Sequence, residues 1–224
     1  MGSEKQAHFA ILKIEVCMDY NFVPGKQVEV PELNFKDSVI LEPKKTALII
    51  VDLQNDFVKE GGNLVVPSAM ATVQNIKSLL EEARQNGIHI AFTQDTMFKG
   101  DLEFDIWPEH CVINTPGWEI IEELKPGDNE LVCQKNRYDG FYGTMLEHYL
   151  SRVWKVENVI IVGTVANICV LHTAASAGLR WFKVILPADG ISALTEFDQA
   201  MTLRQVSWLY SGDIVKNCSA ISFK

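Results

Sequence analysis

Three residues of this 224-residue chain could together perform nucleophilic chemistry: an acid, a cation and a thiol, each close to the end of an apolar segment. Asp52 follows the apolar run 46–51, Lys135 ends a later run, and Cys169 follows a further run after a short turn. A thiol nucleophile is activated by a base that takes its proton and by a cation that stabilises the resulting charges. The three residue types therefore fit a cysteine nucleophile with Asp52 as its base and Lys135 as the cation.

Cys169 is the strongest candidate of the three. It follows the turn 163–168 and opens a predicted helix, so we expect its thiol to ionise readily beside the unpaired N–H groups of the helix start. Each residue also has a purely structural alternative. A buried cysteine is often a packing residue, Asp52 could cap a short helix near residues 53–57, and a lysine at a strand end often lies at the surface.

The elements that would hold these residues alternate between strand and helix from residue 46 onward. Short, continuously apolar runs are typical of strands buried on both faces, and segments with apolar residues at helical spacing separate them. The predicted strands are 46–52, 88–93, 130–135, 158–162, 183–187 and 213–215, and the predicted helices are 67–86, 118–124, 144–153, 168–180 and 196–210. We therefore predict an α/β fold: a single domain with a mostly parallel sheet of about six strands and helices on both faces.

The predicted topology brings the reactive residues to one edge of the sheet. Asp52, Asp95 and Lys135 follow or end three of the predicted strands, and the segment 163–169 follows a fourth. In open parallel sheets, ligands bind beyond the carboxyl ends of the strands. We expect these side chains to line one pocket there.

Residues 1–45 do not continue the alternation. Prolines interrupt this stretch at positions 24, 31 and 43, and only residues 9–16 have the pattern of a strand. We interpret residues 1–45 as an N-terminal extension attached to the domain or to a partner subunit, and residues 46–224 as the functional domain.

Composition excludes several classes of protein. Hydrophobic residues make up 47% and charged residues 22% of the chain, as in an ordinary globular protein, and the net charge of −9 argues against nucleic-acid binding. No apolar run approaches the roughly 20 residues that span a bilayer, and no secretory signal is evident, so we expect no membrane association. The five cysteines are scattered without a disulfide or zinc-module pattern, which favours a cytoplasmic location.

Four stretches resemble one known family. They are Ala47-Leu-Ile-Ile-Val-Asp-Leu-Gln-Asn-Asp-Phe57, Trp107-Pro-Glu-His-Cys-Val112 with Thr115-Pro-Gly117, Lys135-Asn-Arg-Tyr-Asp-Gly-Phe-Tyr-Gly-Thr144, and Gly163-Thr-Val-Ala-Asn-Ile-Cys-Val170. Their order and content resemble those of the isochorismatase-like cysteine hydrolases, and among these most closely the nicotinamidases. The resemblance covers nearly everything from residue 46 onward and leaves residues 1–45 outside it.

The resemblance implies roles for individual residues. The family's Asp-Lys-Cys triad maps onto Asp52, Lys135 and Cys169. Its oxyanion hole maps onto the backbone N–H groups of Val165 and Cys169, with a cis peptide bond expected at Thr164–Val165. The aromatic residues that line the substrate pocket map onto Phe57, Trp107 and Tyr142.

The resemblance also implies a divalent metal site, and here the sequence departs from the family pattern. Asp95 and His110 stand at two ligand positions, and Glu103 is a possible intervening ligand. Met97 occupies the place of the expected first histidine. A thioether is a poor ligand for Zn²⁺, so the departure argues for a weakened site or for none. The triad chemistry itself requires no cofactor.

We therefore predict a cysteine-dependent amidohydrolase, resembling a nicotinamidase, that cleaves a small carboxamide through a thioester and releases ammonia. One alternative is a metal-free amidase acting on an aliphatic amide or a carbamoyl or ureido compound, which Met97 favours. Another is a binding protein that keeps the fold without catalysis. The partner is a small-molecule amide, and the resemblance implies a homodimer or homotetramer.

Overall fold

The computed structural model describes residue 27 and residues 29–224 of the chain. Residues 31–224 form one compact unit, to which all the elements below belong. The predicted boundary between residues 45 and 46 falls inside this unit, so residues 31–45 pack with the rest of it. The strand predicted at residues 9–16 lies outside the described residues.

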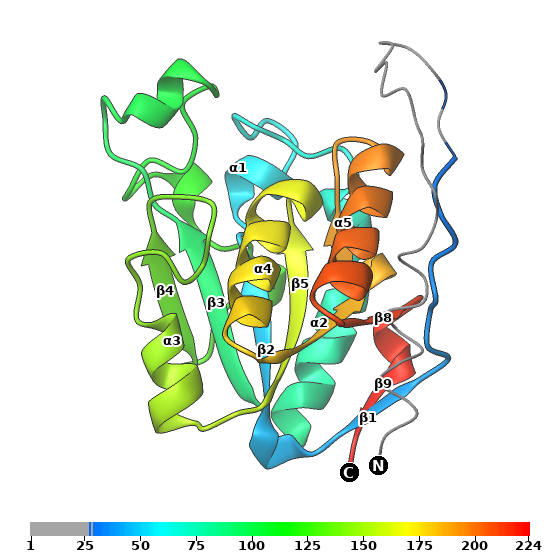
Figure 1. The fold of residues 1–224 in the computed structure, drawn as a ribbon. Coiled ribbons are helices and arrows are strands. Elements are labelled where there is room, and N and C mark those ends of the chain that lie inside the picture. The colour runs from blue at the N-terminus through cyan, green and yellow to red at the C-terminus, as the bar shows by residue number, and fades with distance from the viewer. Residues whose placement is uncertain (1–26, 28) are drawn as a thin grey trace. The chain divides into compact units, whose positions relative to one another are not determined.

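A parallel sheet forms the centre of the unit, as predicted (Figure 1). Its strand order is β4-β3-β2-β5-β6-β8, and a two-residue strand, β7, also pairs with β5. The strands are β2 (Thr46–Val51), β3 (His89–Asp95), β4 (Leu131–Lys135), β5 (Asn158–Thr164), β6 (Lys183–Pro187), β7 (Ile191–Ser192) and β8 (Asp213–Val215). Every pair in the sheet is parallel. The sheet thus has seven strands rather than about six, because β7 is too short to leave a pattern in the sequence.

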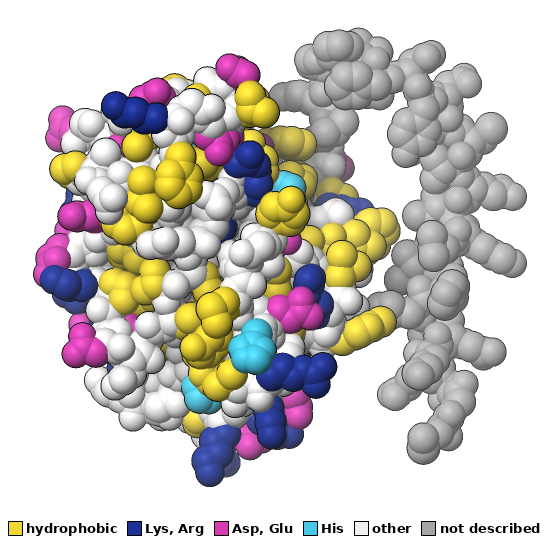
Figure 2. Space-filling model, turned by 90° about the vertical axis from the view of Figure 1, so that its left-hand side faces the viewer, with side chains coloured by type: hydrophobic (Ala, Val, Ile, Leu, Met, Phe, Trp, Pro, Cys, Tyr) yellow, Lys and Arg dark blue, Asp and Glu magenta, His cyan; other side chains and the backbone are white. Residues whose placement is uncertain are grey.

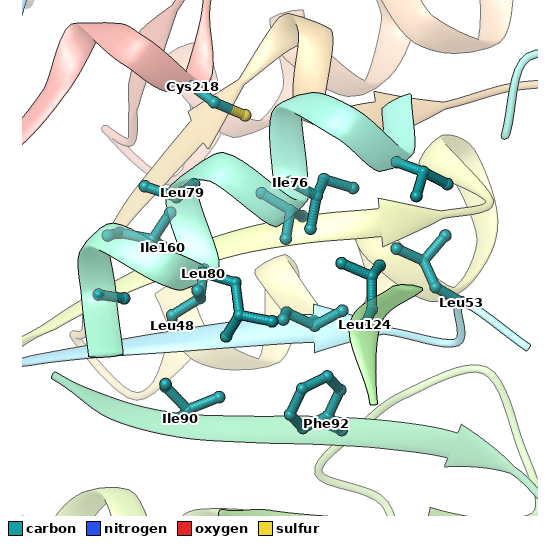
Figure 3. Packing of buried hydrophobic residues seen from close by; sticks show 14 of the residues in the cluster. Leu48, Leu53, Ile76, Leu79, Leu80, Ile90, Phe92, Leu124, Ile160 and Cys218 are labelled. Carbon is teal, nitrogen blue, oxygen red and sulfur yellow. The ribbon is translucent and has the colours of Figure 1, made fainter. Parts of the chain in front are cut away.

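Helices cover both faces of the sheet, because the central strand β2 is apolar on both. Leu48 and Ile50 belong to the core on one face, with the apolar side of α2 (Ala69–Gln85). Figure 3 shows this packing, in which Leu80 of α2 lies beside Leu48 of β2 and Leu79 lies beside Ile160 of β5. Alternate residues of β2 join the core on the opposite face, which α4 (Leu171–Leu179) and α5 (Glu196–Leu209) cover. Neither face of β2 meets solvent.

A second, two-stranded sheet joins the two ends of the unit. The strand β1 (Val39–Leu41) pairs in parallel with β9 (Ile221–Phe223), with Val39 opposite Ile221. The inward side chains of both strands are buried in the same core as α2. The segment before residue 46 is therefore part of the hydrophobic core.

The predicted helix at residues 118–124 is wrong. Two single 3₁₀ turns, Pro116–Trp118 and Glu122–Leu124, stand there instead. Between them, the backbone bonds to another segment: Asn55 N–H donates to the Glu119 carbonyl at 2.9 Å, and Ile121 N–H donates to the Leu53 carbonyl at 3.0 Å. Ile121 and Leu124 are buried, although the segment that carries them is irregular. Apolar residues spaced in this way give the same sequence pattern as a helix, so the pattern alone could not exclude one.

The remaining helices agree in place with the predictions but differ in detail. The short helix α1 (Asn55–Val58) follows β2, and α3 (Leu146–His148) continues into a π-helical segment, Tyr149–Val153. A second π-helical segment, Ala166–Val170, leads into α4. None of the helices within residues 29–224 has the combination of length and apolarity needed to cross a bilayer. On the face shown in Figure 2, acidic, basic and hydrophobic side chains lie interspersed.

Candidate active site

The strand register brings the predicted acid, cation and thiol to one edge of the sheet. Asp95 and Lys135 are opposite each other as the last residues of β3 and β4, and Asp52 directly follows β2. Cys169 approaches from the segment after β5. Gly163, near the end of β5, allows β5 to lie close to β2. It is opposite Val51 and has φ 126°, and a Cβ atom there would lie 2.1 Å from the Val51 carbonyl oxygen. No other residue type fits there without displacing β5 from β2.

Lys135 is the centre of the resulting cluster. Its Nζ lies 2.8 Å from Asp52 Oδ2, 3.1 Å from Asp95 Oδ1 and 3.7 Å from Cys169 Sγ. The side chains of Lys135 and Asp52 are fully shielded from solvent, and Cys169 is only 5% exposed. One buried ammonium group thus contacts two carboxylates and the thiol at once. The sequence predicts Asp52, Asp95, Lys135 and Cys169 at one edge of the sheet, and the structure brings all four together around the Lys135 ammonium.

Burial and charge shift the protonation of this cluster in opposite directions. Burial alone would lower the pKa of Lys135, but the Asp52, Cys169 and Asp95 groups together raise it well above its usual value, so the lysine stays charged. Burial raises the pKa of Asp52 despite the opposing effect of Lys135. Burial also raises the pKa of Cys169 well above that of a free thiol, and the Asp52 and Asp95 carboxylates reinforce the shift against Lys135.

The expectation of a readily ionised thiol is therefore wrong. Cys169 lies inside a π-helical turn ahead of α4 instead of at the start of an α-helix, and burial beside two carboxylates outweighs the attraction of the lysine. The resting thiol keeps its proton at neutral pH and needs a base to ionise. That requirement makes the position of Asp52 decisive.

Asp52 is held in one orientation by its neighbours. Its backbone adopts φ 49°, a left-handed conformation that is uncommon outside glycine. The Thr93 hydroxyl donates to Asp52 Oδ1 at 2.7 Å. Oδ2 forms the ion pair with Lys135, and a carboxylate oxygen has a second lone pair that can accept a further proton.

The segment after β5 presents backbone and thiol together. The peptide bond between Thr164 and Val165 is cis, as predicted. The Val165 carbonyl accepts hydrogen bonds from the N–H groups of Ile168 at 3.0 Å and Val170 at 3.2 Å. Val165 and Cys169 both line the cavity described next, so the two residues of the predicted oxyanion hole flank the same space.

A small cavity lies beside Cys169. Of the three aromatic residues that the resemblance implies for the pocket, Phe57 and Trp107 line this cavity and Tyr142 does not. The turn that buries Phe141 directs Tyr142 to solvent, where it is 67% exposed. Tyr138 lines the cavity in its place, and its hydroxyl accepts a hydrogen bond from Trp107 Nε1 at 3.1 Å. This bond joins the loop after β3 to the loop after β4.

One corner of the cavity holds the three predicted metal ligands. Ligand atoms of Asp95, Glu103 and His110 lie within 4.8 Å of one another, and all three residues are buried. His110 Nε2 is 3.4 Å from Asp95 Oδ2 and 3.9 Å from Glu103 Oε1, while Nδ1 lies 2.7 Å from the Pro108 carbonyl. That carbonyl fixes the proton on Nδ1 in the neutral ring and leaves Nε2 facing the carboxylates, the arrangement of a metal-ligating histidine.

The residue in place of the expected histidine does not take part in this corner. Met97 is fully buried, and its backbone pairs with the segment after His110 through Met97 N–H to the Cys111 carbonyl at 3.0 Å. It is not among the residues that line the cavity. The candidate ligand set is therefore two carboxylates and one imidazole.

Sequence reasoning missed two residues that position the acids. Gln54 is fully buried; its Nε2 donates to the Asp95 carbonyl at 2.8 Å and its Oε1 accepts from the Asp95 N–H at 2.7 Å. Thr93 orients Asp52 as described above. The signal for Gln54 was its place three residues beyond the apolar run 46–51, where a buried amide must find partners. Thr93 gave no such signal.

Comparison with known proteins identifies the family to which this chain belongs. The isochorismatase domain family matches residues 46–215, about three quarters of the chain. The chain belongs to the isochorismatase family. It is a hydrolase of that family, as predicted.

Relatives within the family carry different names. The uncharacterized isochorismatase family protein YaaI of Bacillus subtilis is 31% identical over 157 residues, covering 70% of this chain and 86% of YaaI. The ureidoacrylate amidohydrolase RutB of Agrobacterium fabrum is 26% identical over 215 residues, covering 83% of this chain and 94% of RutB.

Solved structures of family members share the fold. N-carbamoylsarcosine amidase from Thermoplasma acidophilum has a TM-score of 0.70 at 32% identity, covering 76% of this chain and 95% of that chain. The nicotinamidase/pyrazinamidase PncA from Bacillus subtilis has a TM-score of 0.72 at 26% identity, covering 77% and 100%. The pyrazinamidase of Pyrococcus horikoshii, solved in complex with zinc, has a TM-score of 0.71 at 29% identity, covering 76% and 98%.

Proposed function

We propose that this protein is a cysteine-dependent amidohydrolase that cleaves a small carboxamide through a thioester intermediate and releases ammonia. The observation that carries the proposal is the cluster in which Lys135 Nζ lies 2.8 Å from Asp52 Oδ2 and 3.7 Å from Cys169 Sγ, beside a cavity that opens on the thiol. The names of the relatives support it, since RutB, PncA and N-carbamoylsarcosine amidase are each named for the hydrolysis of an amide or carbamoyl compound.

In the first step Asp52 acts as the base. Burial raises the pKa of the Cys169 thiol, so it is protonated at rest, and the Asp52 carboxylate accepts its proton. The thiolate attacks the carbonyl carbon of the substrate while the Lys135 ammonium stays charged and stabilises the new negative charge. The backbone N–H groups of Val165 and Cys169 would hold the developing oxyanion; loss of one such donor typically costs about 10²–10³ in rate.

The second half of the reaction returns the enzyme to its starting state. Asp52 gives the proton to the departing nitrogen, the C–N bond breaks, and ammonia leaves a thioester on Cys169. Asp52 then takes a proton from water, whose oxygen attacks the thioester, and the carboxylic acid and the free thiol result. The raised pKa of Asp52 suits a group that must both accept and return a proton.

A divalent cation fits the corner formed by Asp95, Glu103 and His110. Two carboxylates and one imidazole within 4.8 Å of one another offer three oxygen and nitrogen donors of the kinds that bind zinc in proteins. A bound cation would supply a Lewis acid that holds an electron-rich group of the substrate. We propose that these three residues hold zinc and that Met97 takes no part. Zinc content measured on the purified protein should fall in the His110→Ala variant and stay unchanged in Met97→Leu.

The decisive experiment follows the intermediate and the ammonia together. With a carboxamide substrate, mass spectrometry of the quenched enzyme should detect an acyl group on Cys169. The Cys169→Ala variant should lose ammonia release, whereas Cys218→Ala, which alters a buried cysteine outside the cavity, should keep it. Ammonia release by Cys169→Ala at the wild-type rate would refute the proposal.

The pH dependence tests the role of Asp52 separately. The base must be ionised, so kcat/KM should be high above the pKa of Asp52 and fall as the pH drops through it. Because burial raises that pKa, the acid limb should lie above the range of an ordinary carboxyl group. An acid limb that persists unchanged in Asp52→Asn would contradict the assignment.

A further inference from the structure

A tryptophan follows the helix α4 at a position that usually belongs to glycine. The helix closes with two backbone bonds: Phe182 N–H donates to the Ala177 carbonyl at 3.1 Å, and Trp181 N–H donates to the Gly178 carbonyl at 3.0 Å. In this C-terminal motif the residue after the cap adopts a left-handed conformation, which glycine takes without strain. Here that residue is Trp181, at φ 67°. Glycine in its place would therefore make the single chain easier to fold.

The ring of Trp181 points away from its own chain. It is 94% exposed, the largest fraction of any large hydrophobic side chain in the described part of the protein. Its neighbour Leu179 is 72% exposed, and Leu209, at the end of α5, is 52% exposed. Exposed hydrocarbon and a left-handed backbone at a non-glycine residue each make folding less favourable. Nothing in residues 29–224 covers the ring and offsets these two costs.

A groove lies beside this ring. The helices α4 and α5 lie side by side (Figure 1), and the groove is formed by their C-terminal ends together with the start of β6. Its apolar lining is supplied by Leu179, Trp181, Phe182, Leu209 and Tyr210. The ring and the groove thus belong to one surface patch, at the amino-terminal end of β6 and away from the strand ends that carry the Cys169 cluster.

This patch carries no free charge. Lys183 alone is charged among the described residues that line the groove, and its ammonium pairs with Asp213 at 2.7 Å and donates to the Ser211 carbonyl at 2.7 Å. The chain has a net charge of −9, so two copies repel each other when their acidic surfaces approach. A neutral apolar patch allows them to meet without that repulsion.

We propose that this patch is the interface between two copies of the chain, in which the Trp181 ring of each copy enters the groove of the other. Because the ring and the groove are neighbours, a two-fold rotation forms both contacts at once, as an isologous interface requires. One ring of this exposure supplies about 200 Å², a quarter of the about 800 Å² that each partner contributes to a standard interface. Leu179 and Leu209 add to this area, and a tryptophan buried in a pocket is a common anchor of such contacts.

The experiment measures association of the full-length chain by sedimentation velocity and equilibrium over about 1–100 μM. We expect the wild-type chain to form dimers in this range. Trp181→Gly and Trp181→Ala should each raise the dissociation constant by at least about 100-fold, the effect of removing an anchor ring. Leu209→Lys leaves the ring in place and puts a charge into the groove, so it should also weaken association by about 100-fold.

Thermal unfolding separates association from folding. At a concentration where both variants are monomers, Trp181→Gly should melt about 2–4 °C above Trp181→Ala, because only alanine keeps the left-handed strain. Lys155→Gly is the matched control, since Lys155 is also exposed and has φ 56°. It should raise the melting temperature by a similar amount and leave the dissociation constant unchanged.

Three results would overturn the proposal. The first is a wild-type chain that stays monomeric over the whole range. The second is association that persists unchanged in Trp181→Gly, which would place the contact on another surface. The third is association that is lost in Trp181→Gly but kept in Leu209→Lys, because the ring would then bind the partner outside the groove.

Discussion

The strand-end cluster and the loop-built cavity lining hold their side chains by different means. Asp52, Asp95 and Lys135 are fixed by the backbone register of three adjacent parallel strands, and each is buried. Trp107 and Tyr138 come from two loops and are held together by a single hydrogen bond of 3.1 Å. In the proposed function, the sheet therefore positions the acid and the cation, whereas the residues that would contact the substrate come from loops that can change without disturbing the sheet.

The largest expected effect comes from removing the central cation of the strand-end cluster. In Lys135→Met, Asp52 and Asp95 lose their buried partner, so we expect a loss of about 3–5 kcal/mol in unfolding free energy and a fall in kcat/KM of about 10³-fold or more. The matched control is Lys183→Met, whose half-exposed ammonium pairs with Asp213 at 2.7 Å and should contribute about 1 kcal/mol or less. Urea unfolding and ammonia release measure both. Equal losses of stability and activity in Lys135→Met and Lys183→Met would contradict the special role given to the buried ammonium group.

The next effect tests the backbone of the same edge. In Gly163→Ala the new Cβ would lie 2.1 Å from the Val51 carbonyl oxygen, so β5 must move away from β2. We expect a destabilisation of more than about 4 kcal/mol. Gly143, in the loop after β4, is the control: it also has a positive φ, 68°, but a Cβ there meets nothing within 4 Å, so Gly143→Ala should cost only about 1–2 kcal/mol. Thermal unfolding measures the stability of both variants. Equal losses of stability in Gly163→Ala and Gly143→Ala would contradict the role given to the close approach of β5 and β2.

The loop lining should respond mainly in binding. Tyr138→Phe removes the acceptor for Trp107 Nε1, which loosens the ring against the substrate. We expect KM to rise by about three- to tenfold, the equivalent of one neutral hydrogen bond, with kcat nearly unchanged. The same change at the exposed Tyr142 should alter neither constant. If Tyr142→Phe raised KM and Tyr138→Phe did not, the family-based expectation for Tyr142 would hold instead.

The smallest effect concerns an ion pair remote from the site. Burial alone would raise the pKa of Asp213, but Lys183 and Lys36 lower it. Its carboxylate therefore adds stability above its unfolded pKa of about 3.9, and this is lost as the pH falls through the lowered folded value. Against Asp213→Asn, the difference in unfolding free energy should be about 1 kcal/mol or less near pH 7 and shrink toward about pH 3. A difference that grows in acid would contradict the assignment.

The sequence predicts the strands and the residues at their ends well, and it predicts the irregular segments poorly. The continuous apolar runs led directly to the parallel sheet, and the resemblance placed Asp52, Lys135 and Cys169 where the structure brings them together. The irregular segments escaped: residues 118–124 have the apolar spacing of a helix, yet their backbone bonds to Leu53 and Asn55. The exchange of Tyr142 for Tyr138 depends on one turn, and the raised pKa of Cys169 depends on a depth of burial that no local pattern records.

The pairing of β1 with β9 has a consequence for how the protein can be divided. Residues 46–215 match the family, yet Val39, Leu41 and Ile221, all outside that stretch, are buried against the same core as α2. A fragment trimmed to the matched stretch would lose both strands and expose hydrocarbon on α2 to water, which favours aggregation. The smallest piece expected to fold by itself therefore extends from residue 31 to residue 224, and recombinant versions should be cut no shorter.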